Sequence, residues 1–486
     1  MGFRQFRTKH TAPPNPPGAG SIAISIPVAY QTSQQNGSGQ GTIHLVGTYS
    51  GTPVHIEADW NGSGFALISN EVISAGNWSG DLINMTRGQG TLTVRFSNDT
   101  SVTAIKAHVG IGDVYVCAGD SIARGALANL QTTTTFGSIV ATCYVDGGAG
   151  WQQCDDPTVF GGGGSFWPLL GSLLVRTTGT YPVAFINVGV GSTGIYYPST
   201  GTGCWVKGQA CYTAMMTAIA NASLVNPPKG CIVHLGANDA ADPTTVTTQA
   251  GYLTLLTNFI NNFRSDYPNA TVFFAQLGNL TTGSPPDRRL AIDNVRAATT
   301  QAWAVSGGAP GPVLYDLTND GVHYTTNVEG QAVADRWSVA VANQLYSGTG
   351  GRGPRPTSTT IDATKTIVTI NWDRALGNVV GTSDLTTAFR VEDAGTAKTI
   401  SSAINATSTA TVLQCPAVAG ACTVDLGSQN DANNVTIPTS ADITLPDART
   451  IRLPAETMNN VVPTAAGGSG SASLLVHPGM TGRMAA

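Results

Sequence analysis

The sequence predicts an α/β domain, built on a parallel sheet with helices on both faces, between two all-β domains. In the middle of the chain, short apolar runs alternate with longer segments of helical spacing, whereas both flanks show the two-residue alternation of strands. The length of 486 residues suggests about three domains. Charged residues make up only 11% of the chain, and there are 58 Gly and 26 Pro, a composition typical of turn-rich β structure.

The chain begins with a Pro-rich leader, 1–20. Four of its prolines lie between 13 and 17, where a signal peptide needs its apolar stretch, so no export signal is visible. Residues 21–108 are expected to form an N-terminal β domain, because 21–26 and 91–96 both alternate apolar and polar residues with period two.

Residues 109–346 are expected to form the α/β domain, because strand-like and helix-like segments alternate there. Its strands are predicted at 114–118, 183–188, 231–235, 272–276 and 313–315. Its helices are predicted at 123–130, 166–176, 215–224, 252–263, 290–305 and 330–346.

Residues 347–358 are rich in Gly, Pro and Arg, which is a linker composition. Residues 359–486 return to Thr-rich alternation, as at 366–372, without a convincing helical segment. A C-terminal β-sandwich-like domain is therefore expected.

The charge and hydropathy of the chain exclude two classes of partner. With 24 Lys+Arg against 29 Asp+Glu, the net charge is -5, so no overall positive field gathers phosphates and no nucleic-acid partner is expected. No apolar run approaches the roughly 20 residues that cross a bilayer, so no membrane span is expected.

The eight cysteines include no C-x-x-C pair, which argues against a zinc ribbon or a thioredoxin-type redox site. Cys117 and Cys231 lie in strand-like apolar runs and are expected to be buried thiols. Three further pairs are close in sequence, and each either closes a loop as a disulfide or stays reduced: Cys143 with Cys154, Cys204 with Cys211, and Cys415 with Cys422.

A candidate nucleophile follows the first strand of the α/β domain, in Gly119-Asp120-Ser121. A serine at such a strand-to-helix turn lies at the carboxyl edge of the sheet, where open α/β folds bind their ligands. The following backbone N–H groups are then available to an oxyanion. Gly-Asp-Ser is also an ordinary turn and helix-capping sequence.

A candidate base is His323, in Asp320-Gly321-Val322-His323 just before the last helix. An Asp three residues before a His can accept the Nδ1 proton and leave Nε2 free to take a proton from serine. Asp-x-x-His by itself is common in surface loops.

Two further motifs offer oxyanion donors. In Gly236-Ala237-Asn238-Asp239, the Asn238 amide either donates to developing negative charge or belongs to a turn that caps the next helix. Residues 189–194 match G-x-G-x-x-G, but Tyr196-Tyr197-Pro198 follows in place of a helix, and no Asp or Glu occurs between Asp156 and Asp239 to hold a ribose. A glycine amide that donates to an oxyanion is therefore favoured over a dinucleotide site.

All four motifs fall at strand ends of one predicted sheet, and there is neither a G-x-S-x-G elbow nor an H-E-x-x-H motif. Their order resembles the SGNH (GDSL-like) hydrolase superfamily, whose fold is a flavodoxin-like three-layer α/β/α domain. Residues 109–121 and 320–324 are similar to the nucleophile and His blocks of sialate O-acetylesterase-type carbohydrate esterases, which tend to carry β domains on both sides. Those esterases usually have Gly-Gln-Ser-Asn-Met at the nucleophile, where this chain has Gly-Asp-Ser-Ile-Ala.

The resemblance implies a role for each motif. Ser121 corresponds to the nucleophile, His323 to the general base and Asp320 to its orienting partner. The implied oxyanion hole consists of the Ser121 and Gly191 N–H groups and the Asn238 side chain, with Gly189 as the alternative glycine. No cofactor and no metal are implied.

The resemblance and the flanking β domains favour a serine esterase that removes O-acetyl groups from a surface or capsular polysaccharide. Four aromatic residues in Gly-rich loops either stack on sugar rings or only anchor those loops: Trp151, Tyr196, Tyr197 and Trp205. Two alternatives stay open, a virion or cell-surface glycan-binding scaffold such as a tail fibre, and a general lipase or carboxylesterase. The expected location is extracellular or on a virion surface; association with other virion proteins and homo-oligomerisation stay open.

Overall fold

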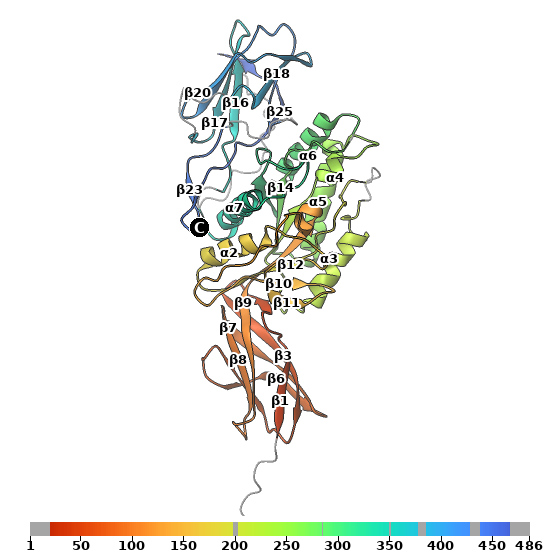
Figure 1. Ribbon diagram of the computed structural model, residues 1–486, viewed down its shortest axis with the longest axis vertical. Helices are drawn as coiled ribbons and strands as arrows, with labels where there is room; N and C mark the ends of the chain where they lie inside the picture. Colours follow the sequence, from red (N-terminus) through yellow and green to blue (C-terminus); the bar gives the residue numbers. More distant parts are fainter. Residues whose placement is uncertain are drawn as a thin grey trace, which may run out of the picture.

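The computed structural model describes residues 20–197, 203–283, 285–348, 351–377, 385–427 and 438–466. Outside them lie the predicted Pro-rich leader apart from Gly20, part of the predicted linker and the end of the predicted C-terminal domain. The described chain is elongated: N-terminal strands, an α/β region and C-terminal strands follow one another along the long axis (Figure 1).

The N-terminal strands form an antiparallel sheet in the order β1-β3-β7-β6, and a second set in which β8 pairs with β4 and β9. The alternation at 21–26 places Ile22 and Ile24 in a buried cluster shared by both sets, with exposed neighbours between them. The strands are β1 (Ser21–Ile26), β2 (Thr32–Gln34), β3 (Gln40–Ser50), β4 (Ile56–Trp60), β5 (Ala66–Leu67), β6 (Ser69–Ser74), β7 (Asn77–Thr86) and β8 (Gly88–Phe96).

The long strand β9 (Thr103–Gly119) joins the N-terminal strands to the α/β region. Its first half pairs antiparallel with β8, and its second half pairs parallel with β12 and β13. One strand therefore crosses the boundary expected between 108 and 109. The division of the chain into domains at the expected positions stays a prediction.

The parallel sheet has the order β10-β12-β9-β13-β14-β15, and β11 adds antiparallel to β10 at the edge. Leaving out β10 and β11, the strands lie in the order 2-1-3-4-5, the flavodoxin-like order. The strands are β10 (Thr142–Val145), β11 (Gly150–Gln153), β12 (Val183–Asn187), β13 (Gly230–His234), β14 (Thr271–Gln276) and β15 (Gly308–Val313).

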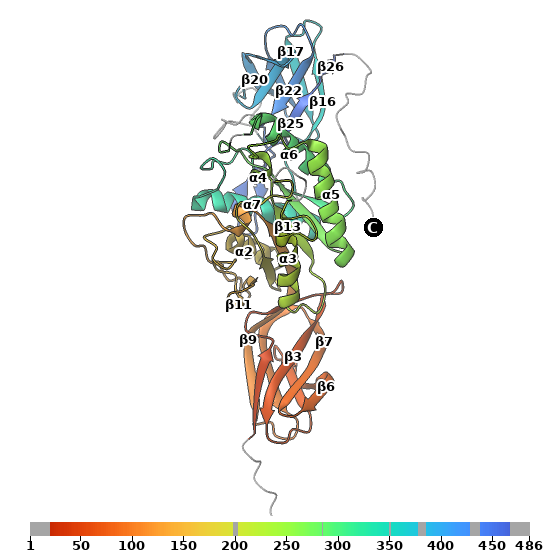
Figure 2. The ribbon, with the colours of Figure 1, turned by 90° about the vertical axis from the view of Figure 1, so that its right-hand side faces the viewer.

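Helices cover both faces of this sheet (Figure 2). In β9, Val114, Val116 and Ala118 belong to a buried cluster with residues of α3, α5 and α6, whereas Tyr115 and Cys117 belong to a cluster with α2 and α7. The strand is apolar on both sides because both sides are covered. The helices are α1 (Ser121–Arg124), α2 (Trp167–Thr178), α3 (Ala210–Asn221), α4 (Ala237–Ala240), α5 (Gln249–Asp266), α6 (Arg288–Ala302) and α7 (Asn327–Leu345).

Three predicted elements were wrong in position. The helix expected at 215–224 is α3, which begins five residues earlier, at Ala210. The last strand is β15, which begins five residues before the expected 313–315. It contains the Pro-Gly-Pro run at 310–312, a pattern typical of a loop. β15 is an edge strand, and an edge strand tolerates proline because one side of its backbone is unpaired. The helix expected at 123–130 is only α1, because Gly125 (φ 114°) ends it and the Leu127 N–H donates to the Gly164 carbonyl. The β10–β11 hairpin was not predicted.

The C-terminal strands form one sheet in the order β20-β21-β17-β16-β26 and another in the order β19-β18-β22-β25. Strand β16 begins at Pro356, inside the expected linker. The strands are β16 (Pro356–Ile361), β17 (Ile367–Trp372), β18 (Phe389–Asp393), β19 (Thr396–Lys398), β20 (Ser402–Thr407), β21 (Ala410–Gln414), β22 (Cys422–Leu426), β23 (Ile443–Thr444), β24 (Thr450–Ile451), β25 (Met458–Val461) and β26 (Thr464–Ala465).

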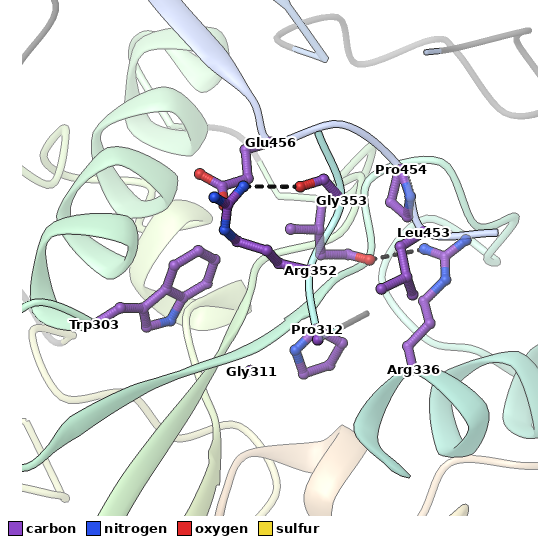
Figure 3. Close-up of a pocket in the computed structure, with 11 residues that line it drawn as sticks. Trp303, Gly311, Pro312, Arg336, Arg352, Gly353, Leu453, Pro454 and Glu456 are labelled. Carbon is purple, nitrogen blue, oxygen red and sulfur yellow. Dashed lines mark hydrogen bonds and ion pairs between the residues drawn. The ribbon is translucent and has the colours of Figure 1, made fainter. Parts of the chain in front are cut away.

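Polar contacts join the C-terminal strands to the α/β region. On α6, Arg289 forms ion pairs with Glu392 (2.5 Å) and Asp425 (2.7 Å). A cavity beside β15, lined by Trp303, Arg352 and Glu456 among others, has a volume of only about 10 Å³ (Figure 3). That volume holds about one water molecule, so this cavity is too small for a ligand.

One of the three cysteine pairs left open by the sequence is a disulfide, Cys204–Cys211. The other two pairs are free, buried thiols, as are Cys117 and Cys231, which confirms the prediction for the last two. Within the described ranges, no helix is both long enough and apolar enough to cross a membrane.

Candidate active site

The turn after β9 presents Ser121 at the carboxyl edge of the sheet. The Asp120 side chain accepts a hydrogen bond from the Ile122 N–H at 3.1 Å and so caps the short helix α1. Gly119 has φ 153°, and a Cβ there would lie 2.2 Å from the His234 carbonyl of β13. Only glycine lets this turn pass so close to the neighbouring strand.

The structure brings Ser121 and His323 together from positions 202 residues apart. Ser121 Oγ lies 2.8 Å from His323 Nε2, within hydrogen-bond distance. Asp320 Oδ2 lies 3.6 Å from His323 Nδ1, an ion-pair distance and too long for a hydrogen bond. The three side chains are arranged in the order predicted for nucleophile, base and orienting group, whose catalytic roles stay a prediction.

Asp320 also holds the backbone of the turn that carries the histidine. Its Oδ1 accepts hydrogen bonds from the N–H groups of His323 (2.8 Å) and Val322 (3.1 Å). Partial burial raises the pKa of Asp320, but these hydrogen bonds outweigh it and bring the pKa below its ordinary value. The carboxylate is therefore ionised at neutral pH, although its side chain is 46% exposed.

The loop after β12 distinguishes the two candidate glycines. The Gly189 N–H already donates to Asn187 Oδ1 at 3.1 Å, and a Cβ on Gly189 would lie 2.3 Å from the backbone nitrogen of Arg124. In the part of the chain that the structure describes, the Gly191 N–H has no hydrogen-bond partner, and a Cβ at Gly191 would lie 4.0 Å from the Ser121 Cβ. Gly189 therefore serves close packing, whereas the Gly191 N–H is free to donate, and its role in an oxyanion hole stays a prediction.

Asn238 is the second residue of α4, the short helix that follows β13, and β13 is the strand next to β9 in the sheet. Its Nδ2 donates to the Thr193 carbonyl at 3.0 Å, which ties it to the loop that carries Gly191. A primary amide has two N–H donors, so one remains for a ligand. The helix α4 takes Gly236 as its N-cap, so the interpretation of Asn238 as a cap is wrong.

The neighbouring Asp239 holds the same loop in place through hydrogen bonds to its backbone. Its buried Oδ1 accepts hydrogen bonds from the N–H groups of Tyr196 (2.7 Å) and Tyr197 (2.9 Å). A Cβ at Gly194 would lie 2.3 Å from this oxygen, so packing against a carboxylate explains the last glycine of the G-x-G-x-x-G motif. Burial raises the pKa of Asp239 to about 6, even though these hydrogen bonds lower it.

Two of the four aromatic residues expected near substrate are in the core instead. Trp151 is 7% exposed and donates to the Ala222 carbonyl, and Trp205 is fully buried and donates to Thr193 Oγ1. Neither ring can stack on a sugar from its position, so both are loop anchors, because burying a large indole against the helices is favourable. Tyr196 and Tyr197 are half-buried, and the Tyr196 ring packs on Gly251 at the start of α5.

The sequence did not single out Asn187, at the end of β12. Its Nδ2 donates to the Ala123 carbonyl of α1 (3.1 Å), and its Oδ1 accepts from Gly189. One side chain therefore joins the nucleophile helix to the glycine loop. The available signal was an Asn that ends an otherwise apolar buried strand.

We expect Asn187→Ala to lower kcat for hydrolysis of an aryl acetate about tenfold with little change in KM. The variant leaves the Gly189 N–H without its buried partner, which should also lower the free energy of unfolding by about 1 to 3 kcal/mol. Initial-rate kinetics and urea unfolding measure the two effects. The matched control is Thr158→Val, which removes the contact of Asn187 with the Thr158 hydroxyl (3.0 Å) and the contact of that hydroxyl with Ser165 Oγ (3.4 Å), but keeps the hydrogen bonds of Asn187 to Ala123 and Gly189. Equal kcat in wild type and Asn187→Ala would contradict the positioning role.

Beneath Ser121, burial raises the pKa of Asp120 to about 7, with the charge of Asp239 acting in the same direction. A carboxyl that keeps its proton in the folded state favours folding below its unfolded pKa of about 4, and this contribution is lost as the pH rises to about 7. Asp120→Asn keeps an acceptor for the Ile122 N–H and removes the titration. The difference in Tm, variant minus wild type, should therefore become more positive from pH 4 to 7. A difference independent of pH would contradict the raised pKa.

No protein-family model and no curated protein matches the chain. Among solved structures, it is similar to a carbohydrate acetylesterase from Xanthomonas citri, with 16% identity, a TM-score of 0.54 and coverage of 89% of this chain and 97% of that one. The chain shares its fold with that protein, and the parallel sheet has the flavodoxin-like strand order. A family two carbohydrate esterase from Clostridium thermocellum matches with 15% identity and a TM-score of 0.32, over 63% of this chain and 93% of that one. At 16% identity the likeness to the Xanthomonas citri protein concerns the fold, and function has to be argued from the site.

Proposed function

We propose that this chain is a serine esterase that removes O-acetyl groups from carbohydrate through an acyl-enzyme. The observation that carries the proposal is the 2.8 Å contact between Ser121 Oγ and His323 Nε2 at the carboxyl edge of the sheet. The contact lies on this edge at β9 and β13, where the strand order reverses. Open α/β folds bind their ligands at such a point. A hydroxyl in contact with an imidazole is the arrangement that nucleophilic acyl transfer needs.

In the proposed reaction, His323 Nε2 takes the Ser121 proton as Oγ attacks the ester carbonyl carbon. The oxyanion receives hydrogen bonds from the N–H groups of Ser121 and Gly191 and from Asn238. When the intermediate collapses, the C–O bond to the sugar breaks, and His323 returns the proton to the leaving hydroxyl. A water molecule, deprotonated by the same imidazole, then attacks the acyl-enzyme and releases acetate and free Ser121.

An acetylated surface or capsular polysaccharide is the substrate class we propose. The support is the fold shared with a protein named as a carbohydrate acetylesterase, together with β structure on both sides of the α/β region. For the same reason we propose that the chain acts outside a cell or on a virion surface. The half-buried Tyr196 and Tyr197, on the loop after Gly191, are the aromatic residues left to contact a sugar.

Acyl-chain selectivity and acetate release test this function together. An acetylesterase should hydrolyse p-nitrophenyl acetate at least about tenfold faster, in kcat/KM, than the butyrate, because each surplus methylene must fit a small pocket. It should also release acetate from acetylated polysaccharide. A preference for octanoate would instead indicate a lipase or carboxylesterase. Rates equal to those of Ser121→Ala on every ester would leave only a structural or glycan-binding role.

A further inference from the structure

A second cavity lies among the N-terminal strands, on a part of the molecule that the esterase proposal does not use. Its volume is about 300 Å³, which is at the lower end of the range for small-ligand sites. Trp60 and Met85 form its less exposed wall. The rest of the lining is polar and exposed, and includes Asn61, Ser63, Asn84 and Arg87.

Local departures from regular strand geometry place the two asparagines at this cavity. Asn61 (φ 55°) follows β4 in a turn, and its side chain lies over Gly90, where a Cβ would be 2.0 Å from Oδ1. Asn84 (φ 58°) lies in β7 where the register with β3 shifts, so that Ile83 and Asn84 oppose one residue of β3. A bulge redirects a side chain, and left-handed backbone at a non-glycine residue is common at ligand-binding positions.

These polar side chains are not used in holding the fold together. Within the described ranges, the side chains of Asn61, Ser63 and Asn84 have no hydrogen-bond partner. Trp60 is different, because its Nε1 donates to the Thr86 carbonyl and its ring is 4% exposed. The cavity therefore combines a fixed aromatic wall with free amide and hydroxyl groups, which donate to and accept from sugar hydroxyls.

Arg87 adds a positive charge that no carboxylate neutralises. Its guanidinium stacks over the Tyr181 ring, 4.5 Å from the centroid, and within the described residues it forms no ion pair. The lining of the cavity that the structure describes contains no Asp or Glu. Stacking holds the guanidinium plane in place, and such a plane binds a carboxylate through two parallel hydrogen bonds.

The cavity and Ser121 lie at opposite ends of the parallel sheet. Tyr181, which stacks with Arg87, precedes β12 at the amino edge, whereas Ser121, Gly191 and Asn238 follow their strands at the carboxyl edge. With a rise of about 3.3 Å per residue, even a five-residue strand separates the two edges by about 15 Å. One monosaccharide therefore cannot occupy both places.

We propose that this cavity is a second, non-catalytic site that binds an acidic saccharide unit. Arg87 binds the carboxylate, and the free groups of Asn61, Ser63 and Asn84 bind the ring hydroxyls. The site requires neither Ser121 nor His323, so this proposal is independent of the proposed esterase activity. It would hold an acidic polysaccharide near the amino edge of the parallel sheet while another part of the same polymer reaches the carboxyl edge.

Titration of the full chain by isothermal calorimetry and by NMR tests the site, with D-glucuronate, D-galacturonate and N-acetylneuraminate as acidic probes. Glucose and galactose are the neutral probes, and sulfate is the simple anion. We expect at least one acidic sugar to bind at least tenfold more tightly than the neutral sugars and than sulfate. Arg87→Gln should weaken that binding at least tenfold. Asn84→Gly should also weaken it, without backbone strain, because glycine adopts the same φ freely.

Lys106→Gln, which removes a cation from β9 outside the lining, is the matched control and should bind like wild type. Hydrolysis of p-nitrophenyl acetate should be the same in Arg87→Gln, Asn84→Gly and wild type, whatever its rate. The proposal is overturned if no acidic sugar binds, or if its binding survives both Arg87→Gln and Asn84→Gly. Neutral sugars or sulfate that bind as tightly as the acidic sugar would overturn it as well.

Discussion

Ser121→Ala is expected to lower kcat for hydrolysis of p-nitrophenyl acetate by about 10⁴-fold or more, because removal of a serine nucleophile removes the acyl-enzyme route altogether. The variant should keep the fold. Ser121 Oγ contacts His323 Nε2, and the Ser121 side chain is only half-buried, so its loss leaves no buried polar group unpaired. Initial rates measure the first effect, and the Tm and the far-ultraviolet circular dichroism spectrum measure the second.

The matched control is Ser138→Ala, at an exposed serine in a loop of the same region, which should hydrolyse the ester like wild type. Residual hydrolysis by Ser121→Ala within tenfold of wild type would show that another nucleophile, or free water, attacks the ester. The acyl-enzyme mechanism would then be wrong. Trapping gives an independent test: a fluorophosphonate should label wild type at residue 121 and leave the variant unlabelled.

His323→Ala is expected to lower kcat by about 10³-fold or more, because its Nε2 is the acceptor that lies 2.8 Å from the nucleophile. Asp320→Asn should cost much less, about tenfold. The Asp320 carboxylate lies 3.6 Å from Nδ1 and is 46% exposed, so solvent weakens its interaction with the imidazole. The side-chain oxygen of Asn can still accept the His323 N–H bond that holds the turn.

Rates across pH 5 to 9 separate these two variants. His323→Ala should lose the rise of activity with increasing pH that deprotonation of a histidine base produces, and Asp320→Asn should keep such a rise at a lower plateau. His55→Ala, at an exposed histidine of the N-terminal strands, should behave like wild type. A full loss of activity in Asp320→Asn would mean that the carboxylate approaches Nδ1 more closely when substrate is bound. Full activity in His323→Ala would remove it as the base.

Most of the α/β elements could be predicted from local pattern. Strands buried on both faces are short continuous apolar runs, so β12, β13 and β14 were found within one or two residues of their ends. The pattern failed at β15, where the Pro-Gly-Pro run resembles a loop, and at β10 and β11, which are four residues each. β11 and β15 are the edge strands of this sheet, and an edge strand can be short or contain proline because only one side must be paired.

Part of the candidate site could also be predicted from local pattern, and part could not. Ser121, His323 and Asn238 stand in short motifs next to predicted elements, so their residue types and strand ends could be recognised. The sequence could not show which glycine faces Ser121, because the choice depends on the Asn187 side chain, which accepts the Gly189 N–H. The burial of Trp151 and Trp205 could not be predicted either. Whether a tryptophan in a Gly-rich loop packs inward or outward depends on contacts with helices that are remote in sequence.

By itself, the sequence determined the order of strands and helices and the chemical groups at the strand ends, because those depend on local hydrophobic pattern and on neighbours within a few residues. Only the tertiary structure decided that Ser121 Oγ meets His323 Nε2, and that polar groups of the turn after β4, of β7 and of the segment between β7 and β8 surround one cavity. These contacts join residues far apart in the chain. Their distances follow from strand order, register and side-chain packing, which no local pattern encodes.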